Sequence, residues 1–217
     1  MPPNTSPTLT LRARGPLACF TRPELKVERV SYPVMTPSAA RGLLEAVLWK
    51  PAIRWVVERI HVLAPIRFVA FRRNEVATRA SAPPRSVIEG GGVITPYFGD
   101  DDRAQRNTLA LRDVDYLIEA RFELTRRAGA EDTVTKFICM FNRRVEGGQH
   151  FHQPYLGCRE LAADVLPAEG APPPVTDSRD LGLMLWDVDY RQGRNRPLFF
   201  TARLEEGVLT VPPGGGS

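Results

Sequence analysis

Residues 20–55 read FTRPELKVERVSYPVMTPSAARGLLEAVLWKPAIRW, and this stretch decides the fold. After a basic extended segment, Thr36 and Pro37 mark a helix start, because a threonine hydroxyl accepts a free N–H of the first turn and proline suits the first helical position. The apolar residues that follow recur at helical spacing, and they are Ala40, Leu43, Leu44, Val47 and Leu48. Pro51 ends the helix, and a strand is predicted from Ile53 onward. The stretch therefore predicts a β-α-β unit.

The overall composition is that of a globular protein with a basic surface. Hydrophobic residues make up 43% of the chain, and no apolar run approaches the roughly 18 residues that a membrane span needs. The N-terminus has neither the basic nor the apolar region of a secretory signal, so we expect a soluble cytoplasmic protein without membrane contact. Only three of the 29 basic residues are lysine, and arginine is the side chain best suited to phosphate. A net charge of +4 favours an anionic polymer as partner.

The remaining strands are predicted on either side of the β-α-β unit. Residues 9–20 are expected to form the first strand, and residues 53–71 a second strand with a proline kink that ends at Arg72–Glu75. Apolar and charged residues alternate over 113–124, which predicts a half-buried antiparallel strand. Residues 77–108 are rich in Pro, Gly, Arg and Asp, and they are expected to form a long mobile loop or a hairpin excursion.

A second helix is predicted over about residues 131–146. Its buried stripe contains Val134, Phe137, Ile138, Phe141 and Val145. Lys136 and Arg143 fall on the opposite face, at about 100° per residue. The order β-α-β-β-α-β over residues 9–166 predicts an α+β chain with a modified ferredoxin-like fold, in which two helices cover one face of an antiparallel sheet. The other face is then available to a ligand.

The chain divides into four predicted parts. Residues 1–166 are expected to form the ferredoxin-like domain and 167–180 a Pro-rich linker. Residues 181–211 are predicted to be a small C-terminal β extension, and 212–217 a disordered tail.

No metal or cofactor is expected. The three cysteines, Cys19, Cys139 and Cys158, lack metal-ligand spacing and are predicted to be buried thiols. The acidic run at residues 100–102 is interpreted as a solvated turn rather than a metal site.

Several long motifs occur in the order typical of one family. They are the stretch 20–55, RRNEV at 72–76, QRNTLALRDVDYLIEARFEL at 105–124, MFNRRVEGGQHFHQPYLGCREL at 140–161 and DLGLMLWDVDY at 180–190. In these motifs the chain resembles the CRISPR-associated Cas-five proteins of subtype I-C, over about residues 9–211. That family belongs to the RAMP superfamily of modified ferredoxin-like RNA-binding proteins.

The resemblance implies an endoribonuclease that works without metal. Such proteins bind the repeat hairpin of precursor crRNA and cut it at its base. A general base takes the proton of a 2′-OH, the oxygen attacks in line, and a cation stabilises the phosphorane, leaving a 2′,3′-cyclic phosphate and a 5′-OH. The protein then stays on the crRNA 5′ handle in the surveillance (Cascade) complex, beside the backbone and large subunits, with target DNA as an indirect partner.

Two positions depart from the pattern of the family members that cut. In those members, a Tyr or other polar residue often precedes the Trp-Lys-Pro motif, and a Lys-His pair lies on the second helix. In this chain Leu48 precedes Trp49, and Phe137 follows Lys136. Both replacements continue apolar stripes, which indicates two core side chains. The alternative function is therefore a catalytically silent subunit that caps the 5′ handle.

The candidate catalytic residues are Lys136, as the phosphate-stabilising cation, with His150 or His152 as the base, because histidine exchanges protons near neutral pH. His61 is expected to be structural. Tyr32 and Tyr97 are open alternatives with nothing in their spacing to favour them.

Basic residues are the candidate RNA contacts, and as a group they predict steeply salt-dependent binding. They are Arg22, Lys26, Arg29, Arg41, Lys50, Arg72, Arg73, Arg106, Arg143, Arg144 and Arg159. We expect four basic residues to share one groove, namely Arg22, Lys26, Lys136 and Arg143.

Overall fold

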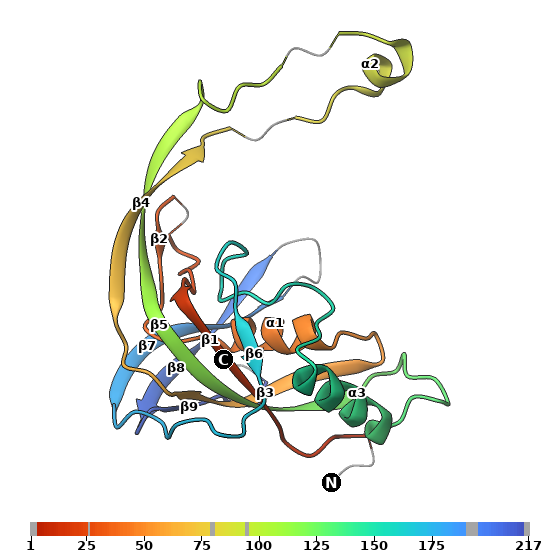
Figure 1. Ribbon diagram of the computed structural model, residues 1–217, viewed down its shortest axis with the longest axis vertical. Helices are drawn as coiled ribbons and strands as arrows, with labels where there is room; N and C mark the ends of the chain where they lie inside the picture. Colours follow the sequence, from red (N-terminus) through yellow and green to blue (C-terminus); the bar gives the residue numbers. More distant parts are fainter. Residues whose placement is uncertain (1–3, 26, 79–80, 94–95, 190–194, 215–217) are drawn as a thin grey trace.

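The computed structural model describes residues 4–25, 27–78, 81–93, 96–189 and 195–214. The predicted β-α-β-β-α-β order is present as β1 (Leu9–Ala18), α1 (Pro37–Val47), β3 (Ile53–Val62), β5 (Arg103–Leu124), α3 (Val134–Glu146) and β6 (Asp164–Leu166). These strands lie in the order β6-β1-β5-β3, and each neighbouring pair is antiparallel. The ferredoxin-like prediction is therefore confirmed (Figure 1).

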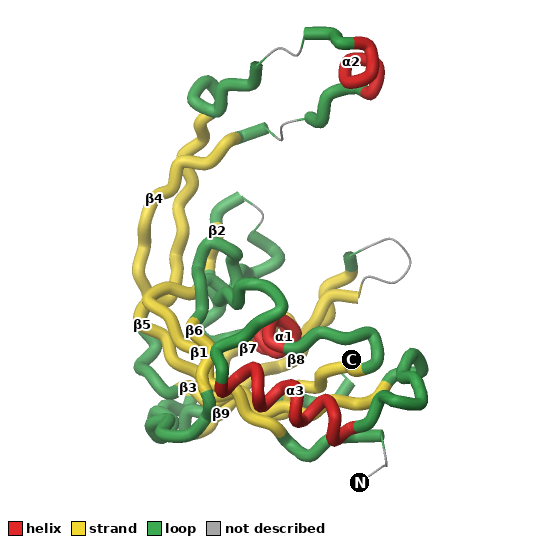
Figure 2. The backbone as a smooth tube through the Cα atoms, turned by 45° about the vertical axis from the view of Figure 1, so that its right-hand side comes forward, coloured by secondary structure: helices red, strands yellow, loops and turns green. Residues whose placement is uncertain are grey.

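Both long helices begin at the threonines that cap them. Thr36 Oγ1 accepts a hydrogen bond from the backbone N–H of Ala39 at 3.3 Å, and Thr133 Oγ1 accepts one from that of Lys136 at 3.2 Å. The second of these caps places the start of α3 at Val134, later than the predicted 131. Figure 2 shows α1 and α3 on the same side of the sheet.

Aromatic rings fill the space between α3 and the sheet. The ring centroid of Trp55 on β3 lies 5.0 Å from that of Phe141 on α3, and that of Phe122 on β5 lies 6.1 Å from that of Phe137. Edge-to-face and tilted arrangements at these distances are favourable beyond the area that they bury. The rings fix the orientation of α3, and with it that of every side chain on its outer face.

The region after β3 forms an arm rather than a loop. A separate strand, β4 (Phe68–Val76), pairs with β5 from Phe68↔Leu111 to Val76↔Arg103, and α2 (Arg85–Gly90) lies beyond the end of this hairpin. The single predicted strand over 53–71 was therefore wrong, since Arg72–Glu75 lies inside β4. Of the two alternatives for 77–108 the hairpin is the better description, and it carries a third helix that was not predicted. The arm rises away from the body in Figures 1 and 2.

The C-terminal strands continue the main sheet. They are β7 (Arg179–Asp189), β8 (Arg196–Glu205) and β9 (Val208–Thr210), and β9 pairs with β3. The short strand β2 (Arg29–Val30) pairs with β5 in parallel. The division of the chain at 166 and 180 stays a prediction, and residues 215–217 of the predicted tail lie outside the described residues. Within the described part of the chain, no helix is long and apolar enough to cross a membrane.

The three cysteines have different exposures. Cys19 is buried, Cys158 is half-buried and Cys139 is exposed on α3, so the prediction of three buried thiols is confirmed for Cys19 and was wrong for Cys139. The apolar stripe of α3 faces inward through Phe137, Phe141 and Val145, and position 139 lies off that stripe.

Candidate nucleic-acid interface

The open face of the sheet was expected to be available to a ligand, but its charges are already paired across the strands. Guanidinium nitrogens lie 2.6 Å from carboxylate oxygens in the pairs Arg12–Asp115 and Arg54–Glu123, and 2.7 Å in Arg59–Glu119. His61, expected to be structural, places its Nε2 2.9 Å from Glu119. Since each of these arginines faces a carboxylate, this face attracts a polyanion only weakly.

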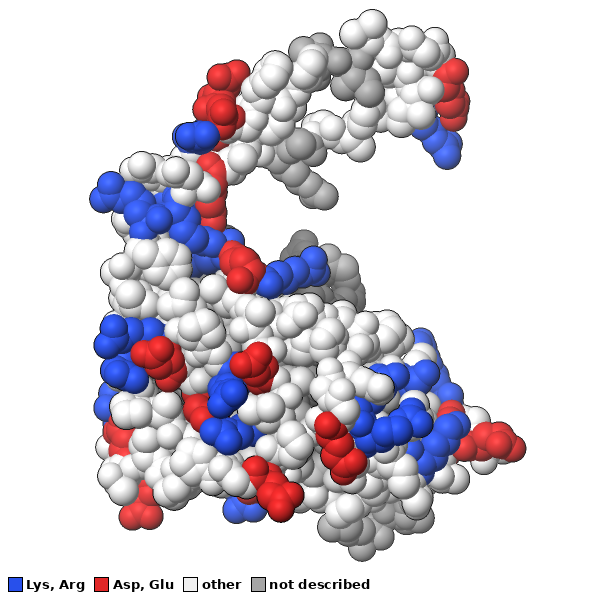
Figure 3. All heavy atoms as spheres, in the orientation of Figure 1, with Lys and Arg blue, Asp and Glu red and all other residues white. Residues whose placement is uncertain are grey.

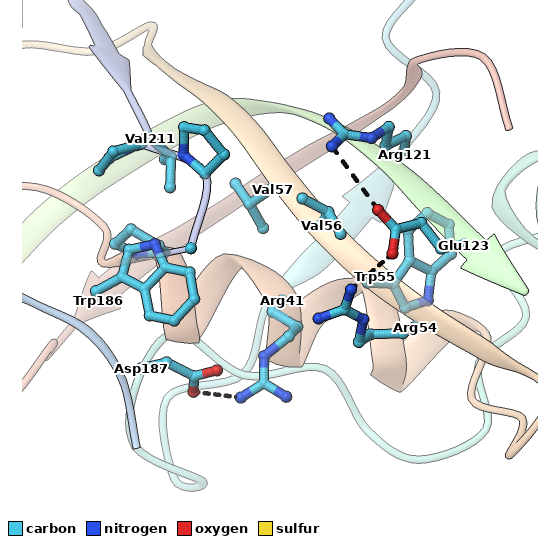
Figure 4. A pocket seen from close by; sticks show the side chains of 14 residues that line it. Arg41, Arg54, Trp55, Val56, Val57, Arg121, Glu123, Trp186, Asp187 and Val211 are labelled. Atoms are coloured by element: carbon cyan, nitrogen blue, oxygen red, sulfur yellow. Dashed lines mark hydrogen bonds and ion pairs between the residues drawn. The ribbon is translucent and has the colours of Figure 1, made fainter. Parts of the chain in front are cut away.

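A cavity of about 310 Å³ lies between α1, β3 and β7 (Figure 4). Arg41 lines it and contacts Asp187 at 2.5 Å, while Arg54 and Arg121 both contact Glu123. The three arginines drawn in Figure 4 are therefore each paired with a carboxylate. Arg41 was a candidate RNA contact, and the structure places its half-buried side chain in the wall of this cavity.

A second group of candidate arginines belongs to a four-residue ion-pair network. Glu160 contacts Arg29 and lies 2.6 Å from Arg73, and Glu75 lies 3.3 Å from Arg29 and 2.5 Å from Arg73. The pKa of Glu160 lies below its ordinary value, because its carboxylate accepts a backbone hydrogen bond and because Arg29 and Arg73 donate to it. The network ties β2 and β4 to the loop after α3, which gives Arg29 and Arg73 a structural role.

Two further candidate RNA contacts, Arg106 and Arg72, lie on the arm. Arg106 lies opposite Arg73 in the register of β4 and β5. Arg72 is exposed on the face of β4 opposite to that of Arg73, and its Nη1 lies 3.3 Å from the side-chain oxygen of Gln105.

Arg22 is separated from the basic residues of α3. Its guanidinium carbon lies 4.4 Å from the centre of the Tyr32 ring, its Nη1 lies 3.5 Å from Glu24, and its backbone N–H donates to Val30 on β2. Figure 1 shows β2 and α3 at separate parts of the molecule. The expectation of one groove shared with Lys136 and Arg143 was therefore wrong for Arg22, and Lys26 lies outside the described residues.

Exposed basic side chains gather instead along α3 and the segments beside it, as Figure 3 shows. We call this set the α3 basic edge, and it consists of Lys50, Arg126, Arg127, Lys136 and Arg143. Thr125 holds its parts together, because its Oγ1 donates to the carbonyl oxygen of Pro51 at 2.6 Å and so fixes the end of β5 against the α1–β3 turn. The doublet Arg126–Arg127 was missed in the sequence, although two adjacent arginines after a strand were a usable signal.

Two lysines of the basic edge face the same carboxylate. Lys136 Nζ lies 3.0 Å from Asp132 Oδ1. The pKa of Asp132 lies below its ordinary value, because the backbone N–H of Gly129 and the Lys136 ammonium both donate to it and because the charge of Lys50 adds to the positive potential. The N-terminal end of α3 thus concentrates positive charge around one acid.

The predicted catalytic residues lie at opposite ends of α3. Lys136 is in the first turn, whereas His150 and His152 follow the last helical residue, Glu146. At 1.5 Å per residue, Lys136 and Glu146 are about 15 Å apart along the axis. Proton transfer requires hydrogen-bond reach, so the joint action of Lys136 and a histidine on one phosphate requires their side chains to extend toward each other, and it stays a prediction. The two ends of α3 are separate candidates for the cutting centre.

The positions that depart from the cutting pattern are in the core. Leu48 is 0% exposed and Phe137 is 2% exposed, which confirms them as core side chains. Tyr32 is likewise fully buried and is not accessible to RNA, while Tyr97 lies near the arm tip and donates its hydroxyl hydrogen to Asp102 at 2.8 Å.

Four more side chains near α3 differ in their contacts and exposure. Arg144 Nη1 donates to the carbonyl oxygen of Val47 at 2.6 Å, so this candidate RNA contact joins α3 to the end of α1. Arg159 is exposed beside His152 and Tyr155. Trp49 and Phe151 were not predicted as site residues, yet they are 48% and 62% exposed.

Comparison with known proteins agrees with the resemblance in the sequence. The model of a CRISPR-associated protein family (Cas5) matches residues 8–212. The CRISPR pre-crRNA endoribonuclease Cas5d of Mannheimia succiniciproducens is 48% identical over 94% of this chain and 95% of its own. The protein of the same name from Thermus thermophilus is 44% identical over 94% of this chain and 91% of its own.

Solved structures share the fold at low sequence identity. A CRISPR-associated protein superimposes with a TM-score of 0.69 at 21% identity, covering 96% of this chain and 93% of that chain. A chain of a CRISPR RNA-guided surveillance complex superimposes with a TM-score of 0.51 at 12% identity, covering 96% of this chain and 92% of that one. With the family model spanning nearly the whole sequence, we conclude that the chain belongs to the CRISPR-associated Cas5 family, in its subtype I-C (Cas5d) branch.

Proposed function

We propose that the chain is a CRISPR pre-crRNA endoribonuclease of the cytoplasm, which binds and cuts the repeat hairpin of the precursor transcript. The observation that carries this proposal is the identity of 44–48% to two relatives named for that activity. The α3 basic edge supports it, because lysine and arginine side chains on one exposed helix suit the closely spaced phosphates of an RNA hairpin.

The proposed reaction is attack by a 2′-OH on the adjacent phosphate without metal. The crowded phosphorane needs positive charge beside its non-bridging oxygens, and Lys136 with Lys50 offers that charge at the N-terminal end of α3. If cutting takes place at the C-terminal end, His150 or His152 serves as base and Arg143 as the nearby cation of α3. Variants at the two ends of α3 distinguish these two arrangements.

The second candidate function is a silent subunit that caps the 5′ handle. Leu48 and Phe137 favour it, because buried apolar side chains replace the polar residues of the cutting members and cannot exchange protons. Loss of a general base typically lowers the rate by about 10²- to 10⁴-fold. In both functions we propose that the protein remains on the handle as a subunit of the surveillance complex, beside its backbone and large subunits, and contacts target DNA only indirectly.

One experiment separates the two functions. Purified protein is incubated with cognate repeat RNA in EDTA, alongside RNA that carries a 2′-deoxy sugar at the cut site. Cutting that survives EDTA and stops with the 2′-deoxy RNA supports the enzyme. Tight binding with intact RNA supports the capping subunit. A protein that neither binds nor cuts the repeat contradicts both functions.

Single variants then locate the centre. Lys136→Ala is expected to slow cutting by about 10²-fold or more if the centre is at the N-terminal end, since a charge-stabilising donor contributes about that much. His150→Ala and His152→Ala test the C-terminal end in the same assay. Arg54→Gln is the control, because Arg54 lies on the open sheet face and is paired with Glu123.

A further inference from the structure

Four ring side chains form a row on the surface where α1 and α3 end. The ring centroid of Phe151 lies 6.2 Å from that of Trp49 and 6.0 Å from that of His152, and His152 lies 6.5 Å from Tyr155 with the ring planes 26° apart. We call these four residues the aromatic row. Large rings as exposed as Trp49 and Phe151 are unusual when contiguous, and such patches mark binding sites.

The row is held in place by its backbone. The N–H of Phe151 donates to the carbonyl oxygen of Ala46, near the end of α1, at 2.6 Å. Tyr155 forms an antiparallel bridge with Ala162. A surface whose rings are already positioned loses little conformational entropy when a ligand binds. The row is therefore preorganised as a contact surface.

A hollow of about 400 Å³ opens at the Tyr155 end of the row. It is lined by His152, Gln153, Tyr155 and Arg159. This volume falls within the range of cavities that hold small organic groups, about 300–1,000 Å³. Arg159 can contact a phosphate or stack on a base, and the Gln153 amide carries both a donor and an acceptor for a base edge. The lining thus combines a flat ring with polar groups that suit a nucleobase.

We propose that the aromatic row binds unpaired bases of the transcript by stacking, with one base seated in the hollow against Tyr155 and Arg159. The inference rests on the proposed function, because it takes RNA as the ligand. Lys50 flanks the row at the Trp49 end and Arg159 at the Tyr155 end, which suits a ligand with negative charge along its whole length. Bases inside a duplex are stacked on each other, so the ligand is a single-stranded segment beside the hairpin.

The test uses the full chain and a short fluorescent oligouridine, which cannot form a hairpin. The variant carries Trp49→Ala and Phe151→Ala, and Phe68→Ala is the control because Phe68 is also exposed but lies on β4. Binding to oligouridine is expected to weaken by about 5- to 150-fold for each stacking ring that is removed, with little change in its salt dependence. The aromatic variant Trp49→Phe with Phe151→Tyr is expected to restore binding.

Equal oligouridine affinity of the double alanine variant and the wild type would overturn the inference, and so would the absence of oligouridine binding by the wild type. Cutting and binding of the repeat hairpin are measured on the same proteins. If the wild type binds or cuts the hairpin but either of those oligouridine results is found, only the proposed role of the aromatic row is refuted. A wild type that binds oligouridine through the row but ignores the hairpin refutes the proposed function instead.

Discussion

The indole N–H of Trp55 donates a hydrogen bond to the carbonyl oxygen of Leu48 at 3.0 Å, in the buried space between β3 and the end of α1. Trp55→Phe removes the donor and leaves that oxygen without its bond, so we expect the free energy of unfolding to fall by about 1–3 kcal/mol in urea titrations. Trp186→Phe is the matched control, because no hydrogen-bond partner for the buried Trp186 Nε1 occurs among the described residues. An equal loss in both variants would contradict a specific role for the Trp55 bond.

Asp132 pairs with Lys136, and we expect it to compete with RNA for this lysine. We expect Asp132→Asn to raise affinity for repeat RNA by about 2- to 5-fold, the range of an exposed ion pair. The gain is expected to vanish when Lys136→Ala is also present, and the four proteins form a double-mutant cycle. Because the pKa of Asp132 lies below its ordinary 3.8, the carboxylate stays charged at every pH above that value and loses its charge only as the pH falls further. The Asp132→Asn effect is therefore expected to be the same at pH 5 and pH 8.

We expect the α3 basic edge to account for the salt dependence of RNA binding. Lys50→Gln and Arg143→Gln are each expected to lower the slope of log K against log[salt] by about 0.7–0.9, the value for one phosphate contact. Arg59→Gln serves as control, since Arg59 is paired with Glu119 on the open face. A larger change in slope for Arg59→Gln than for the two α3 variants would move the interface to the sheet.

Gly157 has a positive φ of 86°, and a Cβ there would lie 2.1 Å from the carbonyl oxygen of Cys19. Gly157→Ala therefore combines backbone strain, about 1–3 kcal/mol, with a backbone clash. Gly148 has a φ of 60° and open space around its Cα, so Gly148→Ala carries the strain alone. We expect a clearly larger fall in thermal midpoint for Gly157→Ala, and equal midpoints would contradict the close packing of this loop on β1.

Cys158 is expected to react as a thiolate. Its pKa is lowered to about 6, chiefly because the Cys19 thiol donates to it, with Thr21 and the charge of Arg29 also contributing. Since the charged form exists above that pKa, alkylation by iodoacetamide in a Cys139→Ser background is expected to rise between pH 5 and pH 7 and then level off. In Cys19→Ala, which removes the donor, the rise is expected at higher pH. An unchanged profile in Cys19→Ala would show that Cys19 does not stabilise the thiolate.

The sequence predicted the elements that local rules govern. The Thr36–Pro37 start of α1, the alternation along β5 and the burial of Leu48 and Phe137 all depend on spacing within a few residues. The arm was misplaced because β4 has one exposed and one half-buried face, and charged residues occur on both, so its sequence lacks apolar alternation.

Long-range pairing explains why the candidate site was only partly predicted. Arg29 and Glu160 are 131 residues apart and Arg41 and Asp187 are 146 apart, so the sequence does not reveal that these arginines are already paired. The aromatic row depends on contacts of the same kind, since its rings come from the α1–β3 turn and from the loop after α3.

One strand, β5, pairs with β1, β2, β3 and β4, all of which precede it in the chain. A ribosome therefore releases four strands before the partner common to all of them has been synthesised. At about 5–20 residues per second, these early strands wait for seconds with open hydrogen-bonding edges that other chains can join. Slower translation before residue 124 is thus expected to increase aggregation, and binding of a chaperone to the nascent chain is expected to decline once β5 has emerged.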